Sequence, residues 1–416
     1  MRRSAGAESW LTMNNPIERE RATFRLERVR ALAGGVLETA QVTFLLLIAT
    51  RWFQASPGEK GLLQGASSAG LLLTPLLVSW AAALGMHAER AAAWLFAMGA
   101  AGVLMAALVP ALPVFLGGAG LGFLCVAATA PFVASIYSQN YRAGRRGDLF
   151  SRNIVVRIVA SVAFAWIAGR VLEADPANFR WILGVYAAAL ILNAWCAWHL
   201  PPVPLVRTEG RNPLRAFRWV REDRLFRLTL ISWMLMGFGN LVMFPLRVEY
   251  LANERYGLHL AATDIALFTT IIPNAARLLF TRVWGRLFDR MNFFTLRILL
   301  NTGFMLGILS FFTGGGSAGL WAGALLFGVA NAGADLAWSL WVTKVAPPER
   351  VTDYMAVHTF LTGARGLVAP FAAFYCAAHF GVGPTAGGAA LLILAASLML
   401  IRERGPAAAQ GVKAGG

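Results

Sequence analysis

The stretch "VWGRLFDRMNFFTLR", residues 283–297, places a cluster of charges between two long apolar runs. Its charged residues are Arg286, Asp289, Arg290 and Arg297, and Arg282 comes directly before it. An apolar helix of about 20 residues spans a hydrocarbon core of about 30 Å, and charges are expensive inside that core. The stretch therefore predicts a short connection between two membrane-spanning helices, in which Gly285 is followed by an acid four residues later.

The apolar runs on both sides of this stretch recur along the whole chain. Its 416 residues are 57% hydrophobic and 14% charged, with a mean hydropathy of +0.59. Soluble domains average about 25% charged residues, so we predict an all-α polytopic membrane protein. The runs predict twelve spans, near residues 31–52, 61–84, 91–110, 112–138, 153–173, 180–200, 226–250, 264–284, 293–313, 318–344, 354–379 and 384–402.

A long polar interval divides these spans into six plus six. It covers residues 201–227, "PPVPLVRTEGRNPLRAFRWVREDRLFR". We therefore expect two six-helix bundles joined by a linker and flanked by two tails. The predicted segments are an N-terminal tail at 1–30, a first bundle at 31–200, a linker at 201–225, a second bundle at 226–402 and a C-terminal tail at 403–416.

The formal net charge of +16 reflects topology rather than a nucleic-acid partner, because the basic residues recur in short loops between the spans. Of the 37 Lys and Arg residues, six fall in the loops of one side and four within spans, so 27 remain on the side that holds both termini. The six are Arg51, Lys60, Arg170, Arg180, Arg247 and Arg255. Basic loops stay in the cytoplasm. We expect both termini and the linker there, in a bacterial inner membrane whose lipids are the surrounding partner.

The two halves contain an internal repeat. An offset of 200 residues sets "GRLFDR" (285–290) on "GMHAER" (85–90), so that Gly285 meets Gly85, Asp289 meets Glu89 and Arg290 meets Arg90. An offset of 204 sets "SLWVTKVAPPER" (339–350) on "SIYSQNYRAGRR" (135–146), where Trp341 meets Tyr137. Two matches at similar offsets, in corresponding loops, indicate a duplication.

The pattern Gly285-x-Leu287-x-Asp289-Arg290, between spans 8 and 9 of a basic-inside six-plus-six chain, resembles the loop signature of the major facilitator superfamily. The resemblance covers roughly residues 30–402. The residues that usually follow the motif are replaced here by "MNFFTLR", and the first copy has His87 and Ala88 at the intermediate positions. The resemblance implies two bundles that rock around a central site, with the two loops latching them on the cytoplasmic side.

We expect Gly85, Glu89, Arg90, Gly285, Asp289 and Arg290 to form this gate. An acid at a loop entrance can accept hydrogen bonds from N–H groups at a helix start, where the macrodipole favours negative charge. The glycines would allow the backbones to approach closely. The alternative is that the arginines only hold the loops in the cytoplasm, and for Arg297 we favour that role.

Several ionisable residues lie at membrane depth, where they face a cavity or a partner. Glu38 and Asp335 are the candidate proton carriers, because a desolvated carboxylate binds protons more readily. Structural ion pairs with the deep arginines are the alternative role. The candidate substrate-binding residues are Gln41, Asn240, Arg277, Asn331, Trp338 and Arg365. Asn331, Asp335 and Trp338 share one helical face by spacing, and His358 is expected to be a satisfied, partly buried histidine.

The sequence contains neither a GxxxxGK[ST] loop nor an HExxH motif, so we predict no enzyme, no cofactor and no metal site. We expect a monomeric secondary active transporter that moves a small solute by alternating access, with protons as the expected coupling ion. Two alternatives remain open. One is a multidrug efflux member of the same fold, and the other is a sensor or lipid-handling member that transports nothing.

Overall fold

A computed structural model describes residues 15–142, 145–205, 216–314, 316–347 and 350–404. The first 14 residues, the last 12 residues and the middle of the predicted linker lie outside these residues. The chain divides into two compact units. Unit 1 contains the described residues up to Ile48 and from Ala66 to residue 205, and unit 2 contains Ala49–Gly65 and the described residues from 216 onward.

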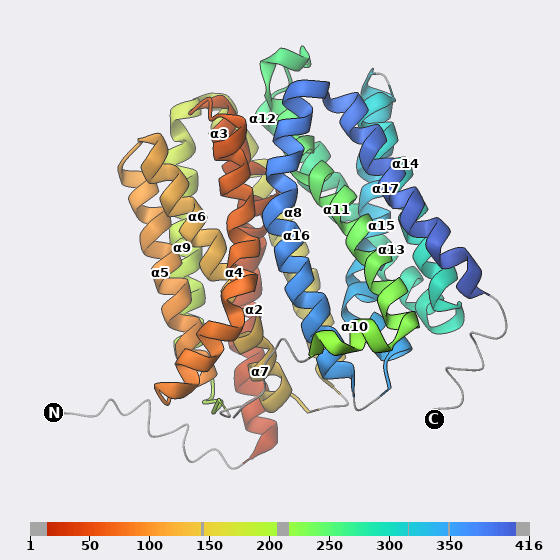
Figure 1. Cartoon of the computed structure of the whole chain (residues 1–416). Coiled ribbons are helices and arrows are strands. Elements are labelled where there is room, and N and C mark those ends of the chain that lie inside the picture. The colour runs from red at the N-terminus through yellow and green to blue at the C-terminus, as the bar shows by residue number, and fades with distance from the viewer. Residues whose placement is uncertain (1–14, 143–144, 206–215, 315, 348–349, 405–416) are drawn as a thin grey trace. The chain divides into compact units, whose positions relative to one another are not determined.

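Unit 1 is built from the helices of the first half of the chain (Figure 1). They are α2 (Pro16–Thr39), η1 (Ala40–Phe44), α3 (Leu45–Arg51), α4 (Pro57–Ala83), α5 (Ala88–Leu108), α6 (Leu112–Ala128), α7 (Ala130–Asn140), α8 (Arg146–Ala174), η2 (Pro176–Asn178) and α9 (Phe179–Trp198). The end of α3 and the start of α4 belong to unit 2, so the six-plus-six division by sequence differs from the compact units in residues 49–65.

Unit 2 contains the helices of the second half. They are α10 (Arg218–Glu222), α11 (Arg224–Ala252), η4 (Glu254–Tyr256), α12 (Ala262–Ala266), η5 (Leu267–Ile271), α13 (Ile272–Arg290), α14 (Phe293–Thr313), α15 (Gly316–Val345), α16 (Val351–Phe380), α17 (Val382–Ile401) and η7 (Arg402–Arg404). The elements η1 and η5 are short π-helices, and η2, η4 and η7 are 3₁₀-helices.

Consecutive helices join into twelve long segments in the described part of the chain, as the sequence predicts. Eleven of them are long and apolar enough to cross a membrane. The twelfth, the α12–η5–α13 segment at 262–290, contains Arg277, Arg282 and Arg286, which lower its hydropathy. Its length nevertheless matches the other segments, so the twelve-helix prediction is confirmed.

The two units repeat one packing plan. In unit 1, α5 packs against α6 and α9, while α2 packs against α8 and α9. In unit 2, α14 packs against α15 and α17, while α11 packs against α16 and α17. The starts of α5 and α14 are 205 residues apart (88 and 293), those of α6 and α15 are 204 apart (112 and 316), and those of α8 and α16 are 205 apart (146 and 351).

This spacing supports the sequence overlay at 204 and shows that the overlay at 200 is wrong. At an offset of 205, Gly85 corresponds to Arg290 and not to Gly285. The two GxxxxR patterns therefore occupy different places. Gly85 lies between α4 and α5, whereas Gly285 lies inside α13.

Small residues let the helices of unit 1 pack closely. A Cβ added to Gly118 of α6 would lie 2.2 Å from the carbonyl oxygen of Gly102 in α5. Because lipid offers no hydrophobic drive for helix association, such close contacts between small residues stabilise membrane bundles. The backbones of α5 and α6 therefore meet directly at this point.

The charged stretch at 283–297 is the end of one helix and the start of the next. Helix α13 continues through Arg290, and Met291 and Asn292 form the whole connection. The Asn292 side chain accepts hydrogen bonds from the backbone N–H groups of Phe294 and Thr295, which caps α14. The predicted connection is confirmed, but Gly285 to Arg290 lie in the last turns of a helix rather than in a loop.

Candidate functional site

Glu38 and Arg157 of unit 1 form an ion pair at membrane depth. Glu38 is near the end of α2, and its Oε2 lies 3.1 Å from Nε of Arg157 in α8. The side chains are 18% and 36% exposed, so both are partly desolvated. The sequence places both residues within predicted spans, with Arg157 nearer the cytoplasmic end, and the structure joins them.

The π-helix η1 begins two residues after Glu38 and lies beside a small cavity. Gln41 in η1 lines this cavity of about 70 Å³ together with Ser67, Phe123 and Tyr186. The Thr39 hydroxyl lies 3.0 Å from the hydroxyl of Tyr186 at the same level. Single-turn π-helices occur frequently at functional sites. The predicted binding residue Gln41 therefore lines a real cavity, although drug-sized ligands need about 300 Å³ or more.

Unit 2 contains a second ion pair, between different helices. Nη2 of Arg277 in α13 lies 2.5 Å from Oδ2 of Asp335 in α15. Arg277 is largely buried and the Asp335 side chain is 48% exposed. Asn331, Asp335 and Trp338 lie on the less buried side of α15, whereas Ala332 and Ala337 are buried. The predicted shared face is confirmed, and Arg277 pairs with an acid instead of standing alone as a substrate anchor.

Three basic side chains gather around Trp233 of α11, and we call Arg297, His358 and Arg365 the basic cluster. The Arg297 Cζ atom lies 3.5 Å from the centroid of the Trp233 ring. The ring of His358 lies 5.4 Å from it, and Arg365 Nη1 donates a hydrogen bond to the Trp233 carbonyl. Among the described residues, no carboxylate forms an ion pair with any of the three.

Two expectations about this cluster are wrong. Arg297 does not simply hold a loop in the cytoplasm, because it is 0% exposed in the first turns of α14. His358 is 0% exposed as well and only half satisfied, since its Nε2 has no hydrogen-bond partner. A cation–π contact contributes about 2 kcal/mol when desolvated, whereas an unpaired buried ion costs several kcal/mol. The contact with Trp233 therefore does not offset the burial of Arg297.

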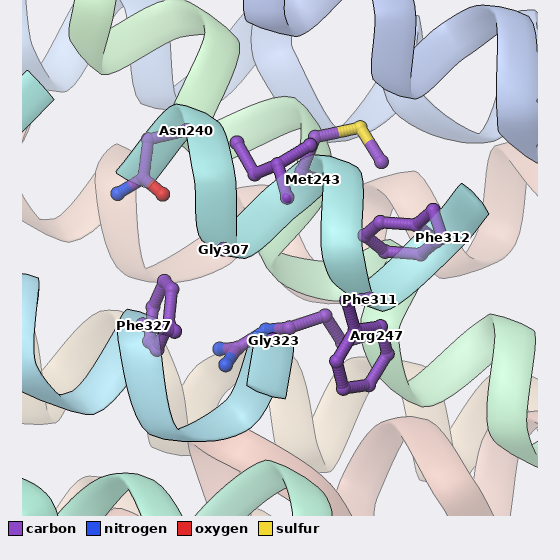
Figure 2. Close-up of a pocket in the computed structure, with 9 residues that line it drawn as sticks. Asn240, Met243, Arg247, Gly307, Phe311, Phe312, Gly323 and Phe327 are labelled. Carbon is purple, nitrogen blue, oxygen red and sulfur yellow. The ribbon is translucent and has the colours of Figure 1, made fainter. Parts of the chain in front are cut away.

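A further buried arginine, Arg247 of α11, lies between α11, α14 and α15. Figure 2 shows its guanidinium group directed toward the ring of Phe327, whose centroid is 3.6 Å from Cζ. It lines a cavity of about 10 Å³ together with Asn240, and the Asn240 side-chain oxygen has no hydrogen-bond partner. A cavity of this size holds about one water molecule. The prediction that Arg247 is an outer-loop residue is wrong, because it is 4% exposed inside a helix.

Lys60 and Glu249 form a buried pair inside unit 2. Nζ of Lys60 lies 2.7 Å from Oε2 of Glu249, and both side chains are 6% exposed or less. Glu249 also accepts hydrogen bonds from Thr50 and Asn253. Lys60 comes from the first half of the sequence, where spacing predicts only an exposed loop. Neither its burial nor its partner has a local sequence signal.

The junction of α2 and α7 in unit 1 holds another buried carboxylate. Glu27 is 2% exposed and accepts hydrogen bonds from Arg30 Nε at 2.9 Å and from the Tyr137 hydroxyl. Just after α7, Arg142 Nε donates to Glu20 at 3.0 Å. This hydrogen bond to the Glu20 carboxylate raises the pKa of Arg142. The basic side chains of this junction are therefore matched by acids.

The first predicted gate motif is built into unit 1. Gly85 has a φ of +65°, which favours glycine, and it ends the turn after α4. Glu89 is 2% exposed and accepts a hydrogen bond from the Val203 backbone N–H, beyond α9. The Arg90 guanidinium carbon lies 3.6 Å from the centroid of Trp198. Glu89 thus holds the start of the linker, whereas we expected it to bind a helix start.

The second predicted gate motif has few contacts in unit 2. Asp289 and Arg290 are exposed on the last turn of α13, and neither has a hydrogen bond or ion pair to the described residues of that unit. A Cβ added to Gly285 would meet nothing within 4 Å, so no close backbone approach occurs there. The gate role of these residues stays a prediction.

Solved structures of membrane transporters share this arrangement of helices. A point mutant of the nucleoside transporter NupG superposes with a TM-score of 0.75 at 13% identity, covering 91% of this chain and 99% of that one. A D-xylose–proton symporter gives 0.63 at 17% identity, covering 93% and 96%. The xylose transporter XylE from E. coli, in an inward-open conformation, gives 0.60 at 16% identity, covering 93% and 95%. Identities this low show a common fold alone.

A match between the sequence and a family model shows the family of the chain. No curated protein matches the chain significantly. The family model of the Major Facilitator Superfamily matches residues 31–370, which include nine of the twelve long helical segments in full and more than half of two others. Together with two units that repeat one packing plan at an offset of about 205 residues, this match establishes that the chain belongs to the major facilitator superfamily.

Proposed function

We propose that the protein is a secondary active transporter that moves a small solute by alternating access and is coupled to protons. The proposal of proton coupling rests on one observation. Each unit has an acid–arginine pair at membrane depth, Glu38–Arg157 in unit 1 and Asp335–Arg277 in unit 2. Two structural neighbours, a nucleoside transporter and a D-xylose–proton symporter, support small polar solutes as the first to test.

Protonation of either acid would change the charge balance of its pair. A neutral carboxyl group no longer attracts the guanidinium, so the arginine becomes available to another partner. A protein is strongly destabilised when a buried ion pair loses one of its charges. Protonation of the acid can therefore shift the equilibrium between conformations. In this scheme Glu38 and Asp335 carry protons, and Gln41, Asn331 and Trp338 contact solute near them.

Reconstituted vesicles with an imposed pH gradient test the proposal. Nucleosides and pentoses are offered one at a time, and solute uptake and proton movement are recorded together. Glu38→Gln mimics the protonated acid, so it should abolish gradient-driven uptake and keep solute exchange at equal pH. Asp335→Asn should do the same if both acids carry protons.

A matched control comes from an exposed ion pair of unit 1. Glu173 pairs with Arg170 at 3.4 Å, with side chains 25% and 65% exposed, so Glu173→Gln should transport like the wild type. Driven uptake that persists in both Glu38→Gln and Asp335→Asn removes these acids from the coupling mechanism. Solute flux that never responds to the gradient contradicts proton coupling while leaving transport intact.

The same vesicles separate the alternatives. Multidrug efflux predicts export of apolar dyes, and the small cavity beside Gln41 does not favour it. A sensor predicts no flux of any solute. We further propose that both termini lie in the cytoplasm of a bacterial cell, that the protein is a monomer, and that the two GxxxxR motifs act in gating. Cysteine labelling from each side of the membrane tests the orientation.

A further inference from the structure

The unpaired polar atoms of the basic cluster are all hydrogen-bond donors. Nε, Nη1 and Nη2 of Arg297 are buried without a partner, and so is Nε of Arg365. The indole Nε1 of Trp341 can only donate, and it lies 3.3 Å from Nδ1 of His358. A neutral His358 therefore has its proton on Nε2, which is also buried without a partner.

These donors have no hydrogen-bond acceptor among the described residues. The described residues supply no carboxylate to Arg297, His358 or Arg365, and the two guanidinium groups remain charged at any ordinary pH. One aromatic ring under Arg297 does not replace the hydrogen bonds that its guanidinium made in water. Neighbouring buried cations also repel each other. An anion between the two guanidinium groups would accept hydrogen bonds from the unpaired donors. It would also offset the repulsion between the two cations.

A glycine in α11 leaves room for the Arg365 guanidinium in the basic cluster. A Cβ added to Gly237 of α11 would lie 2.0 Å from Nη1 of Arg365, so only glycine leaves room for the guanidinium. Arg365 reaches across from α16 and donates to the Trp233 carbonyl, one turn before Gly237. Its position is therefore set by two helices, which is unlike a surface arginine that samples many rotamers.

The cluster has an accessible side. Trp338 of α15 is 36% exposed, and its ring lies 5.7 Å from His358. Arg365 is the only half-buried member of the cluster, whereas Arg297 and His358 are fully buried. An arriving anion would meet Arg365 first, because it is the least buried member, and would reach the inner donors when Arg365 moves with it.

We propose that the basic cluster binds a phosphate-type oxyanion, held by Arg297, His358 and Arg365. Five unpaired donors suit an anion with several oxygens better than a halide, and the planar guanidinium fork matches two oxygens of a phosphate at once. The phosphate belongs either to a free solute or to a phospholipid headgroup. Binding does not depend on transport, so it can be measured whether or not the proposed function holds.

The test is binding of inorganic phosphate to purified full-length protein, by titration calorimetry and by the unfolding temperature. Phosphate stabilises many proteins by being excluded from their surface, so the deciding quantity is the difference between wild type and Arg297→Met. We expect saturable binding and a rise in unfolding temperature in the wild type, and neither in Arg297→Met. Without phosphate, Arg297→Met should unfold at the same or a higher temperature, because it removes an uncompensated buried charge.

Arg247→Met is the matched control. Arg247 is also a buried arginine of unit 2 that stacks on an aromatic ring, but it lies outside the cluster. It should bind phosphate like the wild type. If Arg297→Met fails to fold, Gly237→Ala provides a second route, because it displaces Arg365 and should weaken binding at least tenfold.

Two preparations distinguish the sources of the phosphate. Equal phosphate affinity in lipid-free detergent and in phospholipid nanodiscs supports a free solute. Binding in detergent that disappears in nanodiscs supports a headgroup occupying the cluster. Absence of saturable binding in both preparations overturns the proposal, and so does an equal phosphate effect in the wild type and Arg297→Met.

Discussion

The two units differ in the charges that they bury at the same junction between equivalent helices. At the offset of 204, Tyr137 of α7 corresponds to Trp341 of α15. Tyr137 donates to Glu27, which also pairs with Arg30, so unit 1 neutralises its buried arginine with an acid. Trp341 instead donates to His358, beside Arg297 and Arg365, and the described residues provide no acid there.

The two halves of the repeat therefore share their backbone packing and differ in the charges buried inside it. At the offset of 205, Arg297 and Arg365 correspond to Ala92 and Ala160, so neither arginine has a basic counterpart in unit 1. Unit 1 pairs the buried arginine of this junction with one of its own acids. Unit 2 has the charges of a binding site, which is why we expect substitutions at the two junctions to act in different directions.

The largest expected effect comes from removing the acid in unit 1. Glu27→Gln leaves Arg30 charged, nearly buried and without its ion pair. Breaking a buried pair by removing one partner destabilises a protein by about 3–5 kcal/mol. The measurement is thermal unfolding of the purified protein. Glu173→Gln, in the exposed pair with Arg170, should change stability by less than about 1 kcal/mol, and an equal loss in both variants would contradict the comparison.

The buried pair of Lys60 and Glu249 should respond somewhat less. In Lys60→Met the Glu249 carboxylate keeps its hydrogen bonds from Thr50 and Asn253, so we expect a loss of about 3 kcal/mol, at the lower end for such pairs. The double variant Lys60→Met, Glu249→Leu removes both charges and should unfold at a higher temperature than the single variant. A double variant that is less stable than Lys60→Met would show that the hydrogen bonds of Glu249 outweigh its charge.

Supplying an acid to unit 2 should convert its junction to the state of unit 1. Met234 is half-buried, and its sulfur lies 3.8 Å from Nη1 of Arg365. Met234→Glu places a carboxylate within reach, and hydrogen bonds to charged groups contribute about 1.5–3 kcal/mol. We expect higher stability without phosphate and loss of phosphate binding. Met236→Glu, on a different face of α11 and 4% exposed, should destabilise the protein instead.

The sequence predicts those features of these sites that depend on residues close together in the chain, and it does not predict the others. The span at 293–313 agrees with α14 at both ends, because apolar runs and polar breaks are local signals. Glu38, Arg157, Arg277 and Asp335 are identifiable as deep charges by their distance from the span ends. Their pairing is not, since it depends on which helix faces meet. The sequence places Arg247 and Arg297 in loops, because an arginine near a span end has the same local pattern whether it points outward or into the bundle.

The smallest expected effects distinguish the two GxxxxR motifs. Gly85 has a left-handed backbone, which costs other residues about 1–2 kcal/mol, so Gly85→Ala should destabilise unit 1 by about that amount. Gly285 lies inside α13 with open space around it, so Gly285→Ala should stabilise the helix by about 0.5–1 kcal/mol. Unfolding temperatures of the two variants test this difference in sign. If Gly285→Ala is stable and yet transports more slowly, the glycine acts in a conformation other than this one, as the gate hypothesis requires. Normal transport in a stabilised variant would remove Gly285 from the gate.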